Sequence, residues 1–597
     1  YGESTGAGIR ARLLAAIQEK LKDDLAATAS TTTEDAEDPF ALLGAMDVPV
    51  ILVIDALNQM PDDEQTLKWL PEELPANTRL LVSALDGKAK TALLQRKVKV
   101  HEVQPLDKAR QRQLIDATLA RYSKQLRAED RQHLMDHPLS NSPLFLKMVL
   151  EELRIFGKIR ATTGAGVEQA ISARLDFYLQ AKSLADCFER FLQRLEEDFG
   201  KPLVKEFLAL MLSAPFGLAE SDATVILEPR GHTRLTLSAL LQHLREHLAL
   251  RDGRYDFFHD YLRQAAFNRY MKTPERLKPW RRLLLERALS LGPDDPVALQ
   301  DAAALVLRLG EPELTLDFLS AAPWVARLAA PAEKSYVLRG LFLSLDDRQA
   351  LLERYQAQPV TAEAAAAARI FGRMEQEIGQ PAQAKRWLEQ ALAWNSQLHG
   401  AASEEVAGVW RDMARVYGSD GLKDYPQALD CQQKRLEILS QLHGAASEAV
   451  AGVLGDMAEV YCSRGLKDYP QALDCHQRRL EIYAQLHGEV SEEVAGVWGE
   501  MVEVYGFRGL KDYAQALACH QKRLEIYAQL HGEVSEEVAG VWGEMVEVYG
   551  FRGLKDYAQA LACHQKRLEI LGQLHGAASK EVAGVWGEMA WVHSSDL

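Results

Sequence analysis

The sequence predicts a mainly α-helical chain that begins with a small α/β portion and ends in an α-solenoid. Two observations support this prediction. Clear strand signals are confined to two short apolar runs, at 48–60 and 78–85. Near the other end, the tetrapeptide Gln-Leu-His-Gly begins at Gln397 and recurs every 44 residues up to Gln573. A fixed period of this length is typical of a stacked array, in which each unit packs only against its neighbours.

Composition limits the class of protein. At 597 residues the chain is too long for one core, and it should divide into roughly three to five domains. A net charge of −16 argues against nucleic acid as the main partner, because phosphate binding needs a basic surface. Six cysteines, four of them one repeat position, favour a reducing cytoplasm. No apolar run is long enough to span a bilayer, so we expect no membrane association. The first residues are typical of the interior of a domain, so we expect the chain to begin partway through a longer protein.

The α/β portion is predicted from the apolar run Val50–Ile54, which ends in Asp55. A continuous apolar run is typical of a strand buried on both faces. A helix-like segment ending in Leu-Pro-Glu-Glu-Leu-Pro separates it from the second run, which indicates a parallel sheet. Asp55 would then lie at the carboxyl edge, where ligands bind in open α/β folds. It could hold Mg²⁺ or simply cap the strand, and the strand alone favours neither. A helix at 9–25 and a flexible loop at 26–39 are expected before it.

Helices are expected from Asp107 onward, at 108–122, 128–136 and 144–156 and over most of 166–271. A hairpin turn is expected at Asp252-Gly253. Further helices fill 272–360, and a helix pair at 362–397 leads into the array. Glu151 and Glu152 are expected on a solvated helix face.

The unit that starts at Ser491 predicts two helices. The first is Val494–Tyr505, with Ser491 as N-cap, and the second is Tyr513–Leu530. Gly509 and Gly532 are expected as left-handed caps. The pattern resembles the long tetratricopeptide repeat of kinesin light chain, over about 362–597. The matching residues are Trp498, Met501, Val502, Tyr505, Tyr513 and Ala516.

The first helix of the unit also suggests a binding surface. Gly496, Gly499, Glu503 and Gly506 are small or acidic. Together with Trp498, we expect Gly499 and Glu503 to contribute to a surface for a protein or peptide ligand, open to a bulky or basic partner. The glycines could equally reflect tight helix packing. A Cys-His pair recurs at 475/476, 519/520 and 563/564, but adjacent helix residues point about 100° apart, so core packing is favoured over a metal site.

A second resemblance covers about 1–271. The strings Val-Ile-Asp-Ala-Leu-Asn-Gln, Asn-Ser-Pro-Leu and Tyr-Asp-Phe-Phe-His-Asp-Tyr-Leu resemble the STAND class of signalling NTPases, closest to the NACHT-like domain of nephrocystin-type and telomerase-associated proteins. The resemblance implies a partial P-loop-type nucleotide-binding domain with ATP or ADP and Mg²⁺ as cofactors. It assigns Asp55 to Mg²⁺, Ser83 to the end of the sensor strand, Pro143 to the adenine, and His259 to the β-phosphate of ADP.

The implied domains are a partial nucleotide-binding α/β domain at 1–105, a helical subdomain at 106–160, a winged-helix region at 161–271, a helical arm at 272–360 and the repeat array at 361–597. Two departures from the family matter. No phosphate loop of the form G-x-x-x-x-G-K-[ST] occurs in the sequence, so it lies upstream of Tyr1 or has been lost. Gln59 stands where a catalytic base would be expected, and glutamine only positions water, so hydrolysis should be slow at most.

These expectations lead to a leading function and an alternative. In the leading one, a ligand on the array triggers nucleotide exchange and homo-oligomerisation. These activate an effector upstream of Tyr1, in innate or antiphage defence. The alternative is a non-catalytic adaptor or scaffold with a degenerate nucleotide-binding domain. A weaker third possibility is the regulator of an enzyme whose catalytic domain lies outside this chain.

Overall fold

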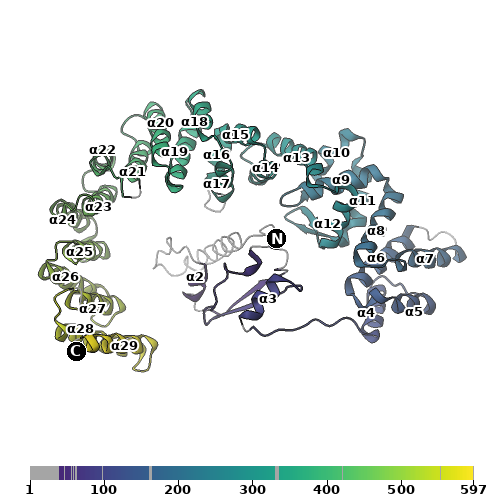
Figure 1. Cartoon of the computed structure of the whole chain (residues 1–597), viewed down its shortest axis with the longest axis horizontal. Coiled ribbons are helices and arrows are strands. Elements are labelled where there is room, and N and C mark those ends of the chain that lie inside the picture. The colour runs from purple at the N-terminus through teal and green to yellow at the C-terminus, as the bar shows by residue number, and fades with distance from the viewer. Residues whose placement is uncertain are drawn as a thin grey trace. The chain divides into compact units, whose positions relative to one another are not determined.

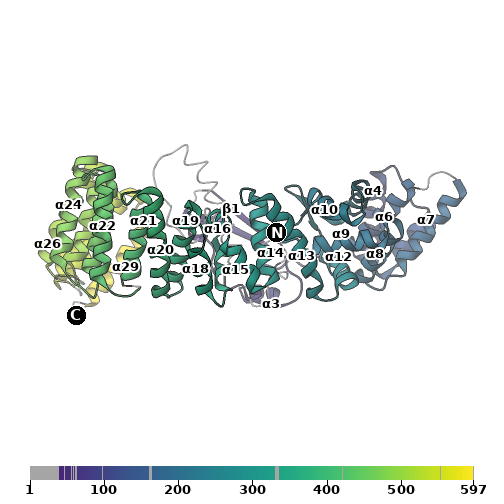
Figure 2. The ribbon, with the colours of Figure 1, turned by 90° about the horizontal axis from the view of Figure 1, so that it is seen from above.

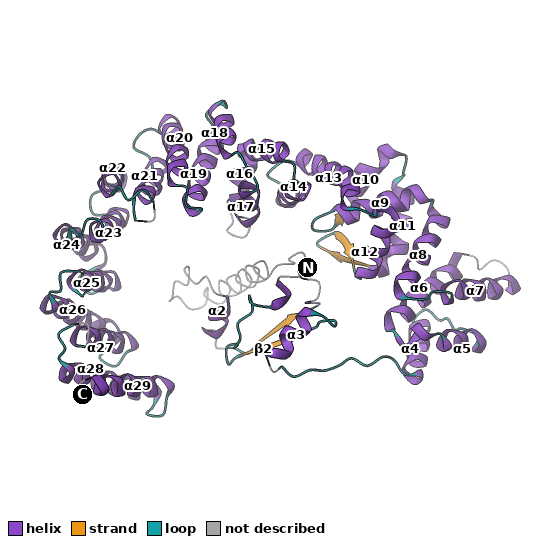
Figure 3. Cartoon of the chain, in the orientation of Figure 1, coloured by secondary structure: helices purple, strands orange, loops and turns teal. Residues whose placement is uncertain are grey.

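A computed structural model describes residues 39–45, 48–55, 57, 60, 64–96, 98–159, 164–329, 335–419, 421–507, 509–550 and 553–595. The predicted helix at 9–25 and Gln59 lie outside these residues. The described chain is mainly helical, as expected (Figure 3). It forms two compact units, one ending with Arg327–Asp346 and the other comprising Ser320–Ala326 and Asp347–Leu597. No helix among the described residues combines the length and apolar character needed to cross a bilayer.

The α/β portion contains the predicted parallel pair of strands. β1 (Val50–Ile54) pairs with β2 (Thr78–Val82) in parallel, so both strands end at the same edge. The helix-like segment expected between them is reduced to a short 3₁₀ turn, η2 (Glu64–Thr66), among the described residues. The remaining helices of this portion are α2 (Pro39–Ala45) and α3 (Lys88–Gln95).

Burial of the first strand differs from the prediction. Val50, Leu52 and Ile54 pack on a core that includes buried Leu57 and Leu93. The alternate side chains face solvent: Ile51 is 72% exposed, Val53 67% and Leu81 63%. The prediction that both faces are buried is therefore wrong. Because successive side chains of a strand point to opposite faces, a core on one face buries only every second residue.

The helical part of the first unit begins at α4, close to the predicted positions, and α5 matches its predicted bounds (Figure 1). Its helices are α4 (Lys108–Ala120), α5 (Ala128–Asp136), α6 (Pro143–Ile159), α7 (Gly164–Leu179), α8 (Leu184–Phe199), α9 (Lys201–Ser213), α10 (Glu220–Leu227), α11 (Arg234–Leu244) and α12 (Asp260–Ala266), with short helices η3 (Pro138–Asn141), η4 (Glu228–Arg230), η5 (Arg245–His247), η6 (Phe267–Met271) and η7 (Pro274–Leu277).

A three-stranded antiparallel sheet has the order β3-β5-β4, with β3 directly before α10 and the hairpin of β4 and β5 after α11. Its strands are β3 (Leu218–Ala219), β4 (Leu248–Arg251) and β5 (Arg254–Phe257). The predicted hairpin turn is confirmed: Asp252 and Gly253 have φ of 47° and 76°. Two successive positive φ values match the twist of tight hairpins, which is why Asp-Gly is favoured there. His259 lies two residues beyond the end of β5 and directly before α12.

Helices then continue through both units. They are α13 (Lys278–Leu291), α14 (Pro296–Leu309), α15 (Pro312–Ser320), α16 (Ala322–Ala329), α17 (Ser335–Leu343) and α18 (Arg348–Gln356). The helix pair expected at 362–397 is α19 (Ala362–Glu377) and α20 (Pro381–His399).

The array is built from helix pairs that stack on one another, as the period predicts. Its helices are α21 (Glu404–Tyr417), α22 (Tyr425–His443), α23 (Glu448–Cys462), α24 (Tyr469–His487), α25 (Glu492–Tyr505), α26 (Tyr513–His531), α27 (Glu536–Tyr549), α28 (Tyr557–His575) and α29 (Lys580–Ser595). The second helices α22, α24 and α26 run side by side (Figure 2). Within this unit the first helices α23, α25 and α27 line the inner side of the curve (Figure 1).

Local signals set the ends of these helices. Ser491 caps α25 as predicted, its hydroxyl accepting from the backbone N–H of Val494 at 3.3 Å. The assignment of Gly509 as a left-handed cap is wrong. Its φ is not positive, and a Cβ there would lie 1.8 Å from the carbonyl oxygen of Val504. The glycine is needed because the chain folds back over the last turn of α25. The left-handed residue is Lys511, with φ 60°.

Gly532, the second predicted left-handed cap, does end α26. Its φ is 88° and its ψ is 161°, so φ is positive but the residue lies outside the left-handed helical region. This part of φ/ψ space is accessible essentially to glycine alone. The prediction of a positive φ is therefore confirmed, and the predicted conformation is corrected.

Candidate functional site

Asp55 and Ser83 lie together at the carboxyl edge of the parallel strands. The backbone N–H of Ser83 donates to the carbonyl of Ile54 at 3.0 Å, which extends the strand pairing by one residue. The Ser83 hydroxyl donates to Asp55 Oδ1. Both residues are exposed. An exposed carboxylate beside a hydroxyl supplies the oxygen ligands that Mg²⁺ prefers. Asp55 and Ser83 could therefore hold a hydrated divalent cation. Gln59, the third residue predicted at this edge, lies outside the described residues.

His259 lies between the end of β5 and α12, and it is half-buried. Its ring meets the ring of Phe258 edge-on, with centroids 4.5 Å apart. Burial lowers the pKa of His259, and the charge of Lys147 lowers that pKa further. Lys147 belongs to α6, whose first residue is the exposed Pro143. The structure thus brings two of the predicted residues, Asp55 and Ser83, together. His259 lies near Lys147, which follows Pro143 by four residues on the same helix.

Lys147 was not predicted from the sequence. Its Nζ lies 5.7 Å from the centroid of the Phe258 ring. The signal that could have found it is its spacing: residues four apart lie on one face of a helix, so Lys147 shares a face with Pro143.

Glu151 and Glu152 were expected on a solvated face, and this is wrong. They are 6% and 3% exposed. Glu152 accepts from Arg194 of α8 through both carboxylate oxygens, and from the hydroxyl of Tyr178 at 2.5 Å. Burial in a low dielectric is tolerated only where charges are paired. This network therefore joins α6, α7 and α8, and its oxygens are already occupied.

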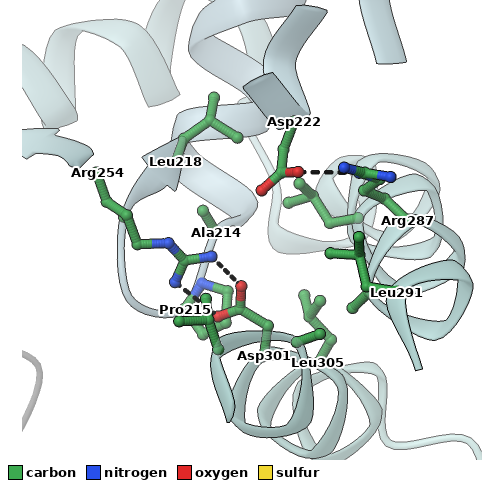
Figure 4. A pocket seen from close by; sticks show the side chains of 14 residues that line it. Ala214, Pro215, Leu218, Asp222, Arg254, Arg287, Leu291, Asp301 and Leu305 are labelled. Carbon is green, nitrogen blue, oxygen red and sulfur yellow. Dashed lines mark hydrogen bonds and ion pairs between the residues drawn. The ribbon is translucent and has the colours of Figure 1, made fainter. Parts of the chain in front are cut away.

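A small cavity lies between the three-stranded sheet and helices α13 and α14 (Figure 4). Its accessible volume is about 20 Å³, which is room for about one water molecule. Arg254 forms a two-pronged ion pair with Asp301 on one side, and Arg287 pairs with Asp222 at 2.9 Å on the other. Ion pairs thus close the cavity on two sides, and it is too small for a nucleotide.

The array residues predicted to bind a ligand have different surroundings. Glu503 is exposed and forms no ion pair with a described residue. Trp498 is half-buried against a core cluster that α24, α25 and α26 share. A Cβ on Gly499 would lie 3.3 Å from the guanidinium carbon of Arg523, so the absence of a side chain at Gly499 leaves room for Arg523. By contrast, a Cβ on Gly496 would meet no atom within 4 Å. Tight helix packing thus explains Gly499, whereas Glu503 is exposed and the space beside Gly496 is empty.

An arginine ladder connects consecutive repeats. Arg523 of α26 pairs with Glu544 of α27, and an arginine pairs with a carboxylate in the same way at each of the other steps. The set is Arg435–Asp456, Arg479–Glu500, Arg523–Glu544 and Arg567–Glu588. Each arginine precedes its acid by 21 residues. This repeated spacing is a signal in the sequence that the prediction missed.

The Cys-His pairs lie in the helix packing beside this ladder. Cys519 is 2% exposed and His520 is fully buried. Neither ring nitrogen of His520 has a hydrogen-bond partner among the described residues. Burial is the main reason that the pKa of His520 falls to about 4, with Glu544 opposing and Arg523 adding to the effect. A histidine held neutral inside the helix stack fits the core-packing reading favoured from the sequence.

The comparisons with known proteins agree with the repeats. Residues 405–485 match the family model of the tetratricopeptide repeat. A TPR repeat-containing protein of Dictyostelium discoideum is 23% identical over 232 residues, which cover 38% of this chain. The match spans only 13% of that protein's length. The C-terminal part of the chain is thus an array of tetratricopeptide repeats.

Among solved structures, a STAND protein with a tetratricopeptide repeat sensor from Pyrococcus horikoshii aligns at 13% identity, covering 94% of this chain and 84% of that one, with a TM-score of 0.42. BtubC from P. vanneervenii aligns at 20% identity, covering 44% and 93%, with a TM-score of 0.28. These scores are low, so the assignment of the repeats rests on the family model and on the helix stacking.

Proposed function

We propose that this chain is a sensor whose tetratricopeptide array binds a basic peptide segment of a partner protein and whose N-terminal part is a nucleotide-controlled switch. In this proposal, a ligand on the array favours an open state, exchange of ADP for ATP, and homo-oligomerisation. The oligomer then activates an effector, in innate or antiphage defence. A ligand can shift such an equilibrium only by its different affinities for the two states.

The observation that carries the ligand-binding part is the open acidic face of the first helices. Glu503 of α25 and Glu547 of α27 are exposed and form no ion pair with a described residue. Gly496 and Gly540, on the same two helices, leave open space where a Cβ would stand. Acids without partners beside uncovered backbone favour a segment that carries cationic side chains and approaches closely.

The test uses peptides of alternating Lys and Ala, with Glu-Ala peptides as the acidic counterpart, and the double variant E503K/E547K. Binding of the Lys peptide should fall roughly tenfold or more, and salt should weaken the wild-type affinity because exposed charges are screened. The matched control is E525K/E569K, which makes the same charge change on the second helices α26 and α28. Equal losses in both double variants would show that net charge alone matters and would remove the proposed surface.

The nucleotide part is supported by the Asp55–Ser83 pair at the carboxyl edge of the strands. In the proposal, Asp55 holds Mg²⁺ beside ATP or ADP, Ser83 orients that carboxylate, Pro143 packs on the adenine and His259 contacts a phosphate. Gln59 positions water weakly, so ATP hydrolysis is slow at most. Asp55→Asn should abolish the Mg²⁺ dependence of nucleotide binding, measured by calorimetry with and without a chelator. Binding that is equally Mg²⁺-dependent in Asp55→Asn would contradict this role.

A second candidate is a non-catalytic adaptor or scaffold, and one observation favours it: the sequence contains no phosphate loop. An adaptor would bind peptide with the same affinity whether or not ADP or ATP is present. A sensor would bind it with different affinities in the two cases, because coupling between two sites is reciprocal. Peptide titrations with ADP, with ATP and without nucleotide therefore decide between the two.

A further inference from the structure

The first helices of the array carry a charged residue at one constant position, and its sign changes along the array. Each of α19, α21, α23, α25 and α27 begins after a Ser or Thr N-cap. The residue twelve positions beyond that N-cap is charged in every case. We call this series the inner column, and its members are, in order along the array, Arg373, Arg415, Glu459, Glu503 and Glu547.

The inner column is open to a partner. Its five helices follow one another along the inner side of the curve of their unit (Figure 1). Residues at the same distance from the N-cap lie on the same face of their helices. All five residues are exposed, and none forms an ion pair with a described residue. The column therefore presents two unpaired positive charges followed by three unpaired negative charges.

The buried carboxylate at the arginine end does not neutralise that end. Asp412 of α21 is 3% exposed and accepts from Arg369 of α19 at 2.5 Å. Arg411 lies 4.0 Å from the same carboxylate. Burial is the main reason that the pKa of Arg411 falls, while Asp412 opposes that fall and three neighbouring arginines, Arg415 among them, add to it. Cations thus outnumber the carboxylate at this end of the array.

A second position changes at the same boundary, between α21 and α23. Eight residues beyond the N-cap, α19 and α21 carry Arg369 and Arg411, whereas the later first helices carry glycine: Gly455, Gly499 and Gly543. Acids of the first turn do not distinguish the two ends, because every one of these helices has at least one. The array therefore has a basic end at α19 and α21 and an acidic end at α23, α25 and α27.

We propose that the inner column binds one extended segment of a partner protein whose own charges are divided, with acidic side chains over α19 and α21 and basic side chains over α23, α25 and α27. This inference rests on the proposed peptide-binding function and adds the register of the ligand. Opposite charges attract across an interface, and like charges placed together cost free energy. A segment displaced toward either end would bring charges of the same sign together, so the column fixes where each part of the ligand lies.

The experiment compares two peptides of equal length and composition on the full 597-residue chain by calorimetry. The block peptide joins a Glu-Ala stretch to a Lys-Ala stretch, and the alternating peptide mixes the same residues evenly. The block peptide is made in both orders, because side-chain charge does not fix the direction of the main chain. The tighter block peptide should bind roughly fivefold or more better than the alternating one, as expected for two additional exposed ion pairs. No preference in wild type would overturn the column.

The variant R373E/R415E makes the whole column acidic and should abolish the preference for the block peptide. The matched control is R386E/R478E, which makes the same charge change at exposed positions of the second helices α20 and α24. The control should keep the preference. Equal loss of the preference in both variants would show that net charge alone matters and would overturn the column.

A second readout uses only the wild-type chain and reports the register directly. A photo-crosslinking residue at the acidic end of the block peptide should label α19 or α21, and one at the basic end should label α25 or α27, as mapped by mass spectrometry. Labelling in the opposite order, or of the same helices from both ends, would contradict the proposed register.

The inference and the proposed function fail separately. If the Lys-Ala peptide binds through Glu503 and Glu547 but the block peptide binds no better than the alternating one, the register is wrong and the peptide-binding sensor survives. If E503K/E547K weakens neither the Lys-Ala peptide nor the block peptide, both are wrong. Failure of every peptide to bind the wild-type chain would also remove both.

Discussion

The two units use the same chemical pair, arginine with a carboxylate, in opposite ways. In the first unit, Arg194 and Glu152 form a single network whose side chains are 4% and 2% exposed. In the second, the ladder repeats a pair such as Arg523–Glu544 at each step, with exposures of 12% and 52%. Burial makes the first pair costly to break, since an unpaired charge cannot be solvated. Repetition makes the ladder tolerant, because each loss affects one interface.

The largest expected effect comes from breaking the buried pair. Arg194→Met leaves Glu152 buried without its cation, and should lower the free energy of unfolding of the first unit by about 3 to 5 kcal/mol. The same change in the ladder, Arg523→Met, should cost about 1 kcal/mol or less, because Glu544 can be solvated. Urea unfolding measures both.

The double variant Arg194→Met/Glu152→Leu controls for the lost side-chain volume. It should recover much of the loss, since an apolar pair of similar size needs no counter-charge. Equal destabilisation by Arg194→Met and Arg523→Met would contradict the comparison.

The second prediction tests whether repetition also protects the turns. Gly509→Ala places a Cβ 1.8 Å from the carbonyl oxygen of Val504, so the backbone must shift. We expect a loss of roughly 2 kcal/mol or more in the stability of that repeat. Gly496→Ala is the matched control within the same repeat, because its Cβ meets no atom within 4 Å. It should stabilise α25 by up to about 1 kcal/mol through helix propensity. Hydrogen exchange in α25 and α26 would measure the loss of stability in Gly509→Ala and the gain in Gly496→Ala. A loss of stability in both variants would argue against the close approach at Gly509.

The third prediction concerns the buried histidines beside the ladder. The pKa of His520 is about 4 in the folded chain and 6.5 in a model peptide. Below pH 6.5 the His520 imidazole binds a proton in the unfolded chain but stays neutral in the folded chain. The free energy of unfolding therefore falls as the pH drops from about 6.5 to about 4. At pH 5 the loss should be about 1 to 2 kcal/mol for this residue. Above pH 6.5 it has no effect.

The chain supplies the matching variant. Gln432 occupies the corresponding place in α22 and is 4% exposed. His520→Gln should therefore reduce the loss of stability between pH 7 and pH 5 and keep the packing, as seen by thermal unfolding at both pH values. His399→Gln, at an exposed position, should leave the pH dependence unchanged. If His520→Gln leaves it unchanged too, the buried histidine does not control it.

The sequence predicted what depends on local pattern. β1 has its predicted bounds because a continuous apolar run and a following aspartate define a strand, and the helix pairs follow from the 44-residue period. Prediction from the sequence failed where tertiary packing determines which residues are buried. An apolar run does not reveal that Ile51 and Val53 are left exposed, and Glu152 has the same local pattern as a solvated glutamate until Arg194 of another helix reaches it.

The candidate site shows the same division. The string around His259 singled out that residue, and the structure adds Lys147, which lies more than a hundred residues earlier and could be suspected only from its spacing to Pro143. In the array, Gly509 was recognised as necessary for the wrong reason. Glycine can indicate a positive φ or a close approach, and only the surrounding atoms distinguish the two.

The smallest predicted effect also belongs to the turns of the array. Lys423, Lys467, Lys511 and Lys555 all have positive φ, between 54° and 60°. A left-handed conformation costs an ordinary side chain about 1 to 2 kcal/mol, and asparagine adopts it more readily. Lys511→Asn should therefore stabilise its repeat by roughly 0.5 kcal/mol, whereas Lys522→Asn, in the interior of α26, should destabilise it by a few tenths of a kcal/mol. The same substitution eleven residues apart would then have opposite signs in urea unfolding. Because the turn recurs in every repeat, combining Lys511→Asn with Lys555→Asn should double the gain if the repeats contribute independently, and a sum well short of that would show that neighbouring turns are coupled.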